Sequence, residues 1–369
     1  MSTLKVEVVT IDSIEKHPNA DRLDLAVVKD WRCVTAKGRF CVGDKAVYFP
    51  IDSILPEDLE AKLFPPDSKI RLEKHRIRTI KIRGAISQGL LCSLEELNPK
   101  WYAWPVGTDM TEKLGVTKYE PPVHMTPQSR ANRVSPNQVN PHFGKYTDIE
   151  NFKNYPELFA ADDEVVILEK AHGTNFRAGY VPFHASTWWK KIKAMLGLTP
   201  KYEFVYGSHN VQLQDKFHYN GYHSENGNVY AEAVDKYRLR EVIPKGHVVY
   251  GEIYGDGIQK GYAYGCAHGE RRLVIFDVKI DGTYVDHGSV ERWTCDRQLP
   301  HAPIEYIGRF IDREFVKQFV DGPSSLCSDQ KIREGIVIKP TKEQMTYMGR
   351  KILKLKSDNF LLNAEDDTH

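Results

Sequence analysis

A lysine at the end of an apolar run is the first residue whose setting indicates chemistry. Residues 165–168 are apolar and β-type, as is typical of a buried strand, and Glu169 and Lys170 end the run. A small polar turn follows at 173–175, and then Arg177. A neutral lysine amine is a nucleophile, and burial or nearby cations lower its pKa. The stretch fits a lysine that attacks a phosphate, and equally an exposed strand end before a glycine turn.

Two acids occur on other predicted strands. Residues 247–255 are β-branched and aromatic around Glu252, and residues 333–340 form a similar run in which Glu334 precedes a glycine. A lone acid in such surroundings is costly unless it is paired or bound to metal. Either glutamate is therefore a candidate metal ligand or, more simply, a salt-bridge partner.

The remaining groups are two lysines and an aromatic side chain. In the predicted strand 351–356, Lys354 and Lys356 fall on one face, and Phe276 lies in the predicted strand 273–280. The lysines could orient a phosphate and Phe276 could stack on a base. A solvated strand face and a core phenylalanine are the ordinary alternatives.

Together these residues are what nucleotidyl transfer to a lysine requires. Lys170 would attack the α-phosphorus of a nucleoside triphosphate, while Glu252 and Glu334 hold a divalent cation. Lys354 and Lys356 would orient the α-phosphate and, by repulsion, favour the neutral amine of Lys170.

Composition sets broad limits. The chain has 369 residues, enough for two or three domains, with globular contents of 41% hydrophobic and 27% charged residues. Its six cysteines contain no C-x-x-C pair, which argues against a zinc site or a disulfide framework. There is neither a membrane-spanning run nor a signal-peptide pattern, so we expect an intracellular protein without a membrane partner, in the cytoplasm or the nucleus. A net charge of +1 gives no global argument for nucleic acid.

The N-terminal part predicts a small β domain. Short β-rich runs at 4–9, 23–28 and 45–49 are separated by turn signals, as in a barrel or sandwich. In residues 74–83 basic and apolar residues alternate, which predicts a cationic strand with a bulge between Arg78 and Lys81. That face could contact phosphates, or protect a solvated edge strand.

Proline-rich residues 99–144 predict a linker. Helices are expected at 146–159, 188–196 and 230–242. The second contains two tryptophans and three lysines, and a packed surface helix is favoured over one that touches nucleic acid or a membrane. The polar stretch 212–228 reads as an insertion without an assigned role.

Several motifs resemble those of a known family. Residues 17–23 and 83–91 resemble the ends of tRNA-binding-type OB domains. Five later motifs together resemble an ATP-dependent RNA ligase of the covalent nucleotidyltransferase superfamily. They are K-A-H-G-T-N-F-R at 170–177, E-I-Y-G at 252–255, I-F-D-V at 275–278, E-G-I-V-I-K at 334–339 and K-L-K at 354–356. His172 resembles the nick-sealing branch. The early OB domain and the short remainder after Lys356 resemble the clade that ends at its last lysine motif.

The resemblance implies an α+β fold. An OB-type β-barrel (1–98) and a linker (99–144) would precede an adenylyltransferase domain of antiparallel sheets with flanking helices (145–369). It also implies that ATP forms a lysyl-AMP with Lys170, that AMP passes to an RNA 5′-phosphate, and that a 3′-OH displaces it. The implied partner is RNA with those two ends, in a nicked duplex, bound by a monomer.

The resemblance also implies a set of site residues. Glu169 would recognise adenine, Phe276 would stack on it, and Arg177 would contact ribose or phosphate. The implied nucleotide-binding set is Glu169, Lys170, Ala171, His172, Asn175, Arg177, Phe276, Glu334, Lys354 and Lys356. Mg²⁺ or Mn²⁺ would bind Glu252 and Glu334. One departure is the turn 207–210, which has His209 where relatives often carry an arginine.

Two alternatives remain open. A DNA ligase or GTP-dependent capping enzyme shares the chemistry, although His172 and the OB domain argue against it. A non-catalytic RNA-binding relative is the other, although the complete set of lysines and acids argues against that.

Overall fold

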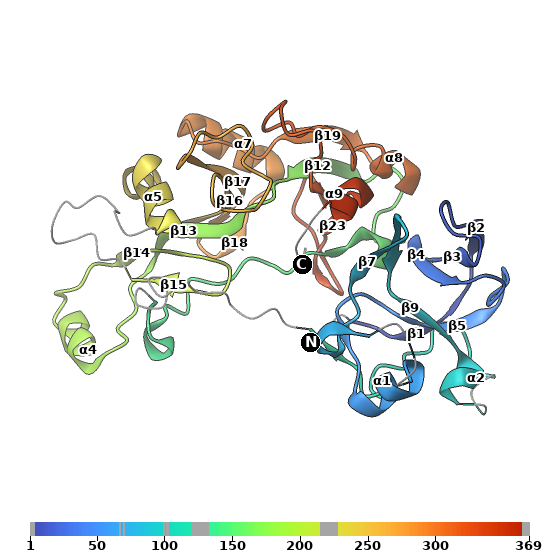
Figure 1. Cartoon of the computed structure of the whole chain (residues 1–369). Helices are drawn as coiled ribbons and strands as arrows, with labels where there is room; N and C mark the ends of the chain where they lie inside the picture. Colours follow the sequence, from blue (N-terminus) through green and yellow to red (C-terminus); the bar gives the residue numbers. More distant parts are fainter. Residues whose placement is uncertain are drawn as a thin grey trace. The chain divides into compact units, whose positions relative to one another are not determined.

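The computed structural model in Figure 1 describes residues 4–65, 68, 71–98, 100, 103–119, 133–214 and 228–363. The described residues divide into two compact units. The first contains 4–119 and 358–363, and the second contains 133–357. Among the described residues, no helix has the length and apolarity to cross a membrane.

Small antiparallel sheets build the first unit, and the strands expected at 23–28 and 45–49 are confirmed. One sheet is β1 (Glu7–Thr10), β5 (Lys45–Phe49) and β9 (Leu90–Ser93), and another is β2 (Ser13–Lys16), β3 (Leu23–Val28) and β4 (Trp31–Ala36). Shorter pairs are β6 (Ser53–Ile54) with β10 (Thr117–Lys118), and β7 (Thr79–Ile82) with β8 (Ala85–Gln88). Apolar clusters around Val47 and Trp31 form the core.

Helices complete this unit at its surface. They are α1 (Glu57–Leu63), α2 (Leu94–Leu97) and the C-terminal α9 (Asp358–Asn363). Phe360 of α9 is fully buried, and Lys81 Nζ donates a 3.4 Å hydrogen bond to the Leu362 carbonyl. The segment after the last lysine motif, which we had assigned to the catalytic domain, therefore begins with a helix of the first unit.

The predicted cationic strand is wrong in its first half. Residues Glu73–His75 form a 3-10 helix (η1), in which Lys74 and His75 have φ of 54° and 60°. Only β7 is a strand, and it pairs with β8 without a register shift. Arg83 and Gly84, both at positive φ, make the tight hairpin turn that fixes this register.

Both ends of the predicted 99–144 linker are packed. Met110 and Val116 belong to the core of the first unit. In the second, Phe143 is buried and the Val134 N–H donates to the Gln212 carbonyl. One connection between the units lies in 120–132, outside the described residues, and the chain returns to the first unit at Asp358.

The second unit contains two sheets, in agreement with the expected α+β class. The five-stranded sheet has the order β11-β23-β20-β12-β19, and the six-stranded sheet β15-β14-β13-β16-β17-β18. Their bounds are β11 (Glu150–Asn151), β12 (Glu164–Lys170), β13 (Thr174–Pro182), β14 (Tyr202–Gly207), β15 (Gln212–Leu213), β16 (His247–Gly255), β17 (Arg271–Ile280), β18 (Thr283–Tyr284), β19 (Ile304–Arg309), β20 (Gly335–Pro340) and β23 (Leu353–Lys356). A separate hairpin joins β21 (Met345–Thr346) to β22 (Gly349–Arg350). Neighbours in both large sheets are antiparallel except β11 and β23.

Helices cover the outer faces of these sheets. They include α5 (Val229–Lys236), α6 (Leu239–Val242), α7 (His287–Asp296) and α8 (Arg313–Lys317). Residues of α5, α6 and α7 pack on the six-stranded sheet, as Figure 1 shows for α5 and α7. The single helix expected at 230–242 is two, because Arg238 adopts a left-handed φ of 50° between them.

The helix expected at 146–159 is also wrong. That segment contains β11 and a 3-10 turn, η4 (Phe152–Asn154). Tyr146 and Phe152 pack into different apolar clusters, so their side chains do not share one helical face. Residues 215–227 of the predicted insertion lie outside the described residues, while Gln212 and Leu213 form β15.

Candidate functional site

Strand register brings one acid between two lysines in the five-stranded sheet. Lys170 at the end of β12 pairs with Gly335 of β20, and Gly335 also pairs with Lys356 of β23. Glu334 directly precedes β20 and therefore lies between Lys170 of β12 and Lys356 of β23. Its Oε2 lies 2.7 Å from Lys170 Nζ and its Oε1 lies 3.2 Å from Lys356 Nζ.

A tight turn carries the chain from this sheet to the other. After Lys170, residues 171–173 lead into β13, which pairs with β16 so that Asn175 lies opposite Glu252. A Cβ on Gly173 would lie 2.2 Å from the Ile253 carbonyl oxygen, which is a steric clash. Only glycine, which has no Cβ, fits at this position. This close approach is what brings Glu252 of the six-stranded sheet toward Lys170.

The acids control the charge of the lysine. Burial lowers the pKa of Lys170, but the carboxylates of Glu334 and Glu252 more than offset this, and the pKa is raised. We expected repulsion from Lys354 and Lys356 to keep Lys170 neutral. That expectation is wrong for the protein without bound nucleotide. The repulsion is seen instead at Lys354, where burial, Lys356 and Lys170 lower the pKa to about 8.

The pKa values of the two glutamates are shifted in opposite directions. Burial raises the pKa of Glu334, but Lys170 and Lys356 reverse this and hold it well below its usual range. Burial raises the pKa of Glu252 to about 8, with Lys170 offsetting it only in part and Glu334 adding to it. Glu252 is thus a half-buried carboxyl group whose raised pKa favours the protonated form near neutral pH.

A cavity of about 120 Å³ lies beside Lys170. Glu169, Lys170, Asn175, Glu252 and Lys339 supply its polar wall. The rest of the lining is largely apolar: Tyr146, Ile149, Leu168, Ala171, Val274, Phe276, Ala302, Val337 and Ile352. A small, largely apolar cavity with a few polar lining groups suits an aromatic ring joined to a charged group.

A β-bulge aims Phe276 into this cavity. In the pairing of β16 with β17, Tyr250 lies opposite Asp277 and Gly251 opposite Ile275, so Phe276 is the extra residue. Ile275 and Val278 can therefore both join the helix-covered core, although they are three residues apart. Phe276 packs instead against Tyr146, with ring centroids 5.0 Å apart.

Glu169 faces the same cavity from β12. Its carboxylate accepts hydrogen bonds from Ser324 Oγ at 2.5 Å and from the Ser325 N–H at 2.6 Å. Burial raises its pKa, and these two bonds lower it in part. The two serines hold the carboxylate in place, and no sequence signal had singled them out.

His172 and Asn175 differ in their partners. The His172 N–H donates to the Tyr264 hydroxyl at 2.8 Å, and His172 Nδ1 lies 3.6 Å from Glu334 Oε2. Asn175 Oδ1 is buried and accepts no hydrogen bond from the described residues. A donor supplied by a ligand in the cavity would satisfy it.

The sequence interpretation missed a buried charged network behind Phe276. Fully buried Asp277 accepts from Tyr146 Oη at 2.6 Å, Arg350 at 2.9 Å and Lys339 Nζ at 3.0 Å. Lys339 also lines the cavity. Strand alternation could have identified Lys339 as a cavity residue, because Val337 and Lys339 lie on the same face of β20 and both line the cavity.

The site lies within a segment that matches a family model. The model described as RNA ligase matches residues 163–356, which is more than half of the chain. The chain belongs to the RNA ligase family. A second model, described as an OB-fold domain, matches residues 5–94 of this family member.

Solved structures of Naegleria gruberi RNA ligase are similar to this RNA ligase along its whole length. One mutant without ligand has a TM-score of 0.71 at 23% identity and covers 99% of each chain. Another, with ATP and Mn, has a TM-score of 0.68 at 22% identity and covers 98% of this chain and 99% of its own. A third, with PPi, has a TM-score of 0.65 at 23% identity and covers 98% of each. These likenesses show the fold.

The N-terminal unit also has a relative of its own. It is 34% identical over 97 residues to the beta subunit of phenylalanine–tRNA ligase from Geobacter sulfurreducens. That match covers 25% of this chain and 10% of the beta subunit. The match therefore covers about a tenth of the length of this curated relative.

Arg177 of the RNA ligase is placed differently from the other site residues. Its side chain is buried, and it donates from Nε to the Ser208 carbonyl at 2.8 Å and from a terminal nitrogen to the Phe143 carbonyl at 2.6 Å. Its guanidinium carbon lies 4.1 Å from the Phe143 ring centroid. Arg177 does not line the cavity, and these contacts tie β13 to residues 143 and 208.

We therefore expect Arg177→Ala to lower stability and to leave nucleotide affinity within about twofold. Losing two charged hydrogen bonds to buried carbonyls should cost about 3 kcal/mol of unfolding free energy. Chemical denaturation and nucleotide titration of the same preparation measure the two effects. Exposed Arg309→Ala is the control and should change neither. Unchanged stability with a large loss of affinity would show that Arg177 contacts nucleotide after all.

The acids are compatible with a divalent cation. Glu252 and Glu334 are hard oxygen ligands, and bound positive charge would lower the raised pKa of Glu252. In the part of the chain that the structure describes, no three His, Cys, Asp or Glu side chains form a complete metal cage. A cation there would take its other ligands from phosphate oxygens or water.

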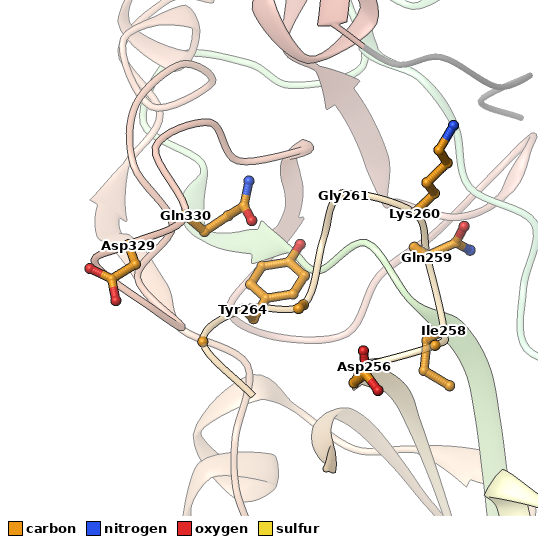
Figure 2. A pocket seen from close by; sticks show the side chains of 11 residues that line it. Asp256, Ile258, Gln259, Lys260, Gly261, Tyr264, Asp329 and Gln330 are labelled. Atoms are coloured by element: carbon orange, nitrogen blue, oxygen red, sulfur yellow. The ribbon is translucent and has the colours of Figure 1, made fainter. Parts of the chain in front are cut away.

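A larger cavity, of about 580 Å³, lies elsewhere in the unit (Figure 2). It is lined by the loop 256–265 together with Asp329 and Gln330 and does not contain Lys170 or the paired lysines. The loop nevertheless supports the motif turn, because Gln259 Nε2 donates to the Gly173 carbonyl at 2.8 Å. Lys170, Glu252 and Phe276 line the smaller cavity instead.

Proposed function

We propose that this RNA ligase joins RNA 3′-OH and 5′-phosphate ends through lysyl-AMP and RNA-adenylate intermediates. One observation carries the proposal. The amine of Lys170 lies 2.7 Å from the carboxylate of Glu334 at the rim of a cavity lined by Phe276. A nucleophile, an acid and a base-sized apolar pocket within one site match lysine nucleotidylation.

ATP is the nucleotide that we propose for the cavity. Its adenine would lie against Phe276, and the carboxylate of Glu169 would accept from the adenine amino group. Guanine presents a carbonyl oxygen at that position, which a carboxylate repels. The Naegleria gruberi structure with ATP and Mn supports this assignment.

Mg²⁺ or Mn²⁺ is the cation that we propose for Glu252 and Glu334. When bound, it would neutralise charge on the phosphates. Glu252 must lose its proton to become a ligand, and its pKa of about 8 makes that loss possible near neutral pH. Glu334 would then be shared between the cation and Lys170. This weakens the ion pair that keeps the lysine protonated.

Three displacements at phosphorus complete the proposed reaction. Neutral Lys170 Nζ forms a bond to the α-phosphorus as the bond to pyrophosphate breaks. A 5′-phosphate oxygen of RNA then bonds to that phosphorus and Lys170 leaves. Finally a 3′-OH oxygen attacks the RNA 5′-phosphorus, the hydroxyl proton passes to water, and AMP leaves with the bonding electron pair. Lys354 and Lys356 would stabilise the charge that develops on the α-phosphate.

The proposed polymer substrate is a nicked RNA duplex, bound by a monomeric intracellular enzyme that acts in RNA repair. The OB-fold unit supports a nucleic-acid substrate, because this fold often binds oligonucleotides. The basic segment 74–83 of that unit supports a nucleic-acid substrate less than expected, because two of its arginines are paired with acids. Arg76 pairs with Asp52 at 2.6 Å and Arg78 with Glu73 at 2.8 Å.

The test is a sealing assay on nicked duplexes with RNA or DNA on each side of the nick. We expect joining with ATP and Mg²⁺ when RNA supplies the 3′-OH, and at least about tenfold less with GTP, which corresponds to about 1.4 kcal/mol. Omission of the divalent cation is the control. Joining that requires GTP, or that prefers DNA on both sides, would favour a capping-type enzyme or a DNA ligase. Failure to take up AMP under any condition would favour a non-catalytic RNA-binding protein.

A further inference from the structure

Helix α4 (Trp188–Met195) joins β13 to β14 in the second unit, and no residue of α4 is buried. Figure 1 shows it away from the two sheets of its unit. The sequence had favoured a packed surface helix, and that expectation is wrong. An isolated helix of eight residues is marginal in water, so the Thr187 N-cap alone gives it little support.

Large apolar side chains are exposed on this helix and just after it. The exposed fractions are 59% for Trp188, 59% for Trp189, 80% for Met195, 62% for Leu196 and 70% for Leu198. The two indole rings stack on each other with centroids 3.7 Å apart. So many exposed apolar groups within eleven residues mark an interaction surface.

The helix separates apolar from cationic side chains. At about 100° per residue, Trp188, Trp189, Ile192 and Met195 fall within an arc of about 120°. Lysines 190, 191 and 193 occupy the remaining arc. The exposed apolar face thus has basic residues along both of its edges.

The charged side chains in the chain segment that carries α4 have one sign. No aspartate or glutamate occurs between Lys170 and Glu203, whereas Lys201 adds a further cation shortly after the helix in the chain. A second copy of this chain would present the same lysines and be repelled. An occupant must therefore be anionic, and it must also cover aliphatic groups.

We propose that α4 docks in the plane of an anionic lipid bilayer. Its tryptophans, Met195 and the leucines would enter the boundary between headgroups and acyl chains, while its lysines contact the lipid phosphates. RNA would match the lysines and could stack on the indoles. It offers no apolar phase for Met195, Leu196 and Leu198, which is why the observations favour lipid.

This surface association differs from membrane spanning, for which no described helix is suited. It changes our expectation that the protein has no membrane partner. One short helix gives weak, reversible binding, and the lysine contribution should fall as salt screens it.

The test is co-sedimentation of the full chain with vesicles. We expect the protein to pellet with phosphatidylcholine vesicles that contain phosphatidylserine, and to remain in the supernatant with phosphatidylcholine alone. The double variant Trp188→Ala/Trp189→Ala, and separately Leu196→Ala/Leu198→Ala, should each weaken binding about tenfold. Far-ultraviolet circular dichroism and a thermal melt check that both variants fold.

A matched control removes exposed apolar side chains elsewhere. Met345 and Tyr347 are 72% and 84% exposed on the β21–β22 hairpin, and Met345→Ala/Tyr347→Ala should bind vesicles like the wild type. Nicked duplex RNA without vesicles forms a further arm, in which the α4 variants should bind like the wild type. The proposal is overturned if the wild type does not pellet, if folded α4 variants pellet equally well, or if those variants lose RNA affinity instead.

Discussion

Lys170→Ala is expected to form no covalent AMP adduct and to seal no nick. Lys170 Nζ is the atom that we propose to attack the α-phosphorus, and alanine supplies no replacement. Incubation with ATP labelled at the α-phosphate, followed by denaturing electrophoresis, measures the adduct. The loss should exceed about a thousandfold, the usual scale when a nucleophile that acts within a unit is removed.

Lys170→Arg is the matched control for charge. It keeps a cation beside Glu334, so it should fold like the wild type and still form no adduct. Mass spectrometry of the wild-type adduct should place AMP on residue 170. A label on Lys354 would contradict the mechanism, and Lys354 is the relevant rival because its pKa of about 8 leaves more neutral amine.

Glu334→Gln is expected to lower both adenylylation and stability. The carboxylate pairs with Lys170 at 2.7 Å and Lys356 at 3.2 Å, and the side chains of Glu334 and Lys356 are almost fully enclosed. An amide of the same shape would remove the negative charge that pairs with both Lys170 and Lys356. We expect a loss of about 3 kcal/mol in unfolding free energy, measured by chemical denaturation. The adenylylation rate should fall at least about a hundredfold.

The stability loss should depend on pH in a definite direction. The lysines hold the pKa of Glu334 below its usual range, so its charge stabilises the fold above the ordinary carboxyl pKa of about 4.3. This contribution fades as pH falls toward the lower pKa of the folded state. The difference between wild type and variant should therefore be full at pH 7 and shrink below about pH 4.

Asp163→Asn is the control, because it breaks the 2.6 Å ion pair with Lys351 away from the cavity. It should cost stability and leave adenylylation intact. If Glu334→Gln retained wild-type adenylylation, the carboxylate would not be part of the chemistry.

The sequence was informative wherever local pattern decides structure. The runs 165–168 and 247–255 lie in strands β12 and β16, because periodicity and β-propensity act over a few residues. The order of the motifs also identified the family, which the RNA ligase model then showed independently. Local pattern failed at 146–159, where burial in two different clusters overrode a helix-like spacing.

Only the tertiary structure determined the direction of the pKa shift at Lys170 and the hydrogen-bond partners of Arg177. The sequence placed lysines near Lys170 and so suggested a lowered pKa, but strand register places Glu334 closer, and the pKa is raised. It also proposed a ligand contact for Arg177, and the structure shows two of its donors bonded to the carbonyls of residues 143 and 208. Electrostatic energy depends on distances and burial between residues far apart in the chain. The sequence therefore determined which groups are present, and the fold determined which of them meet.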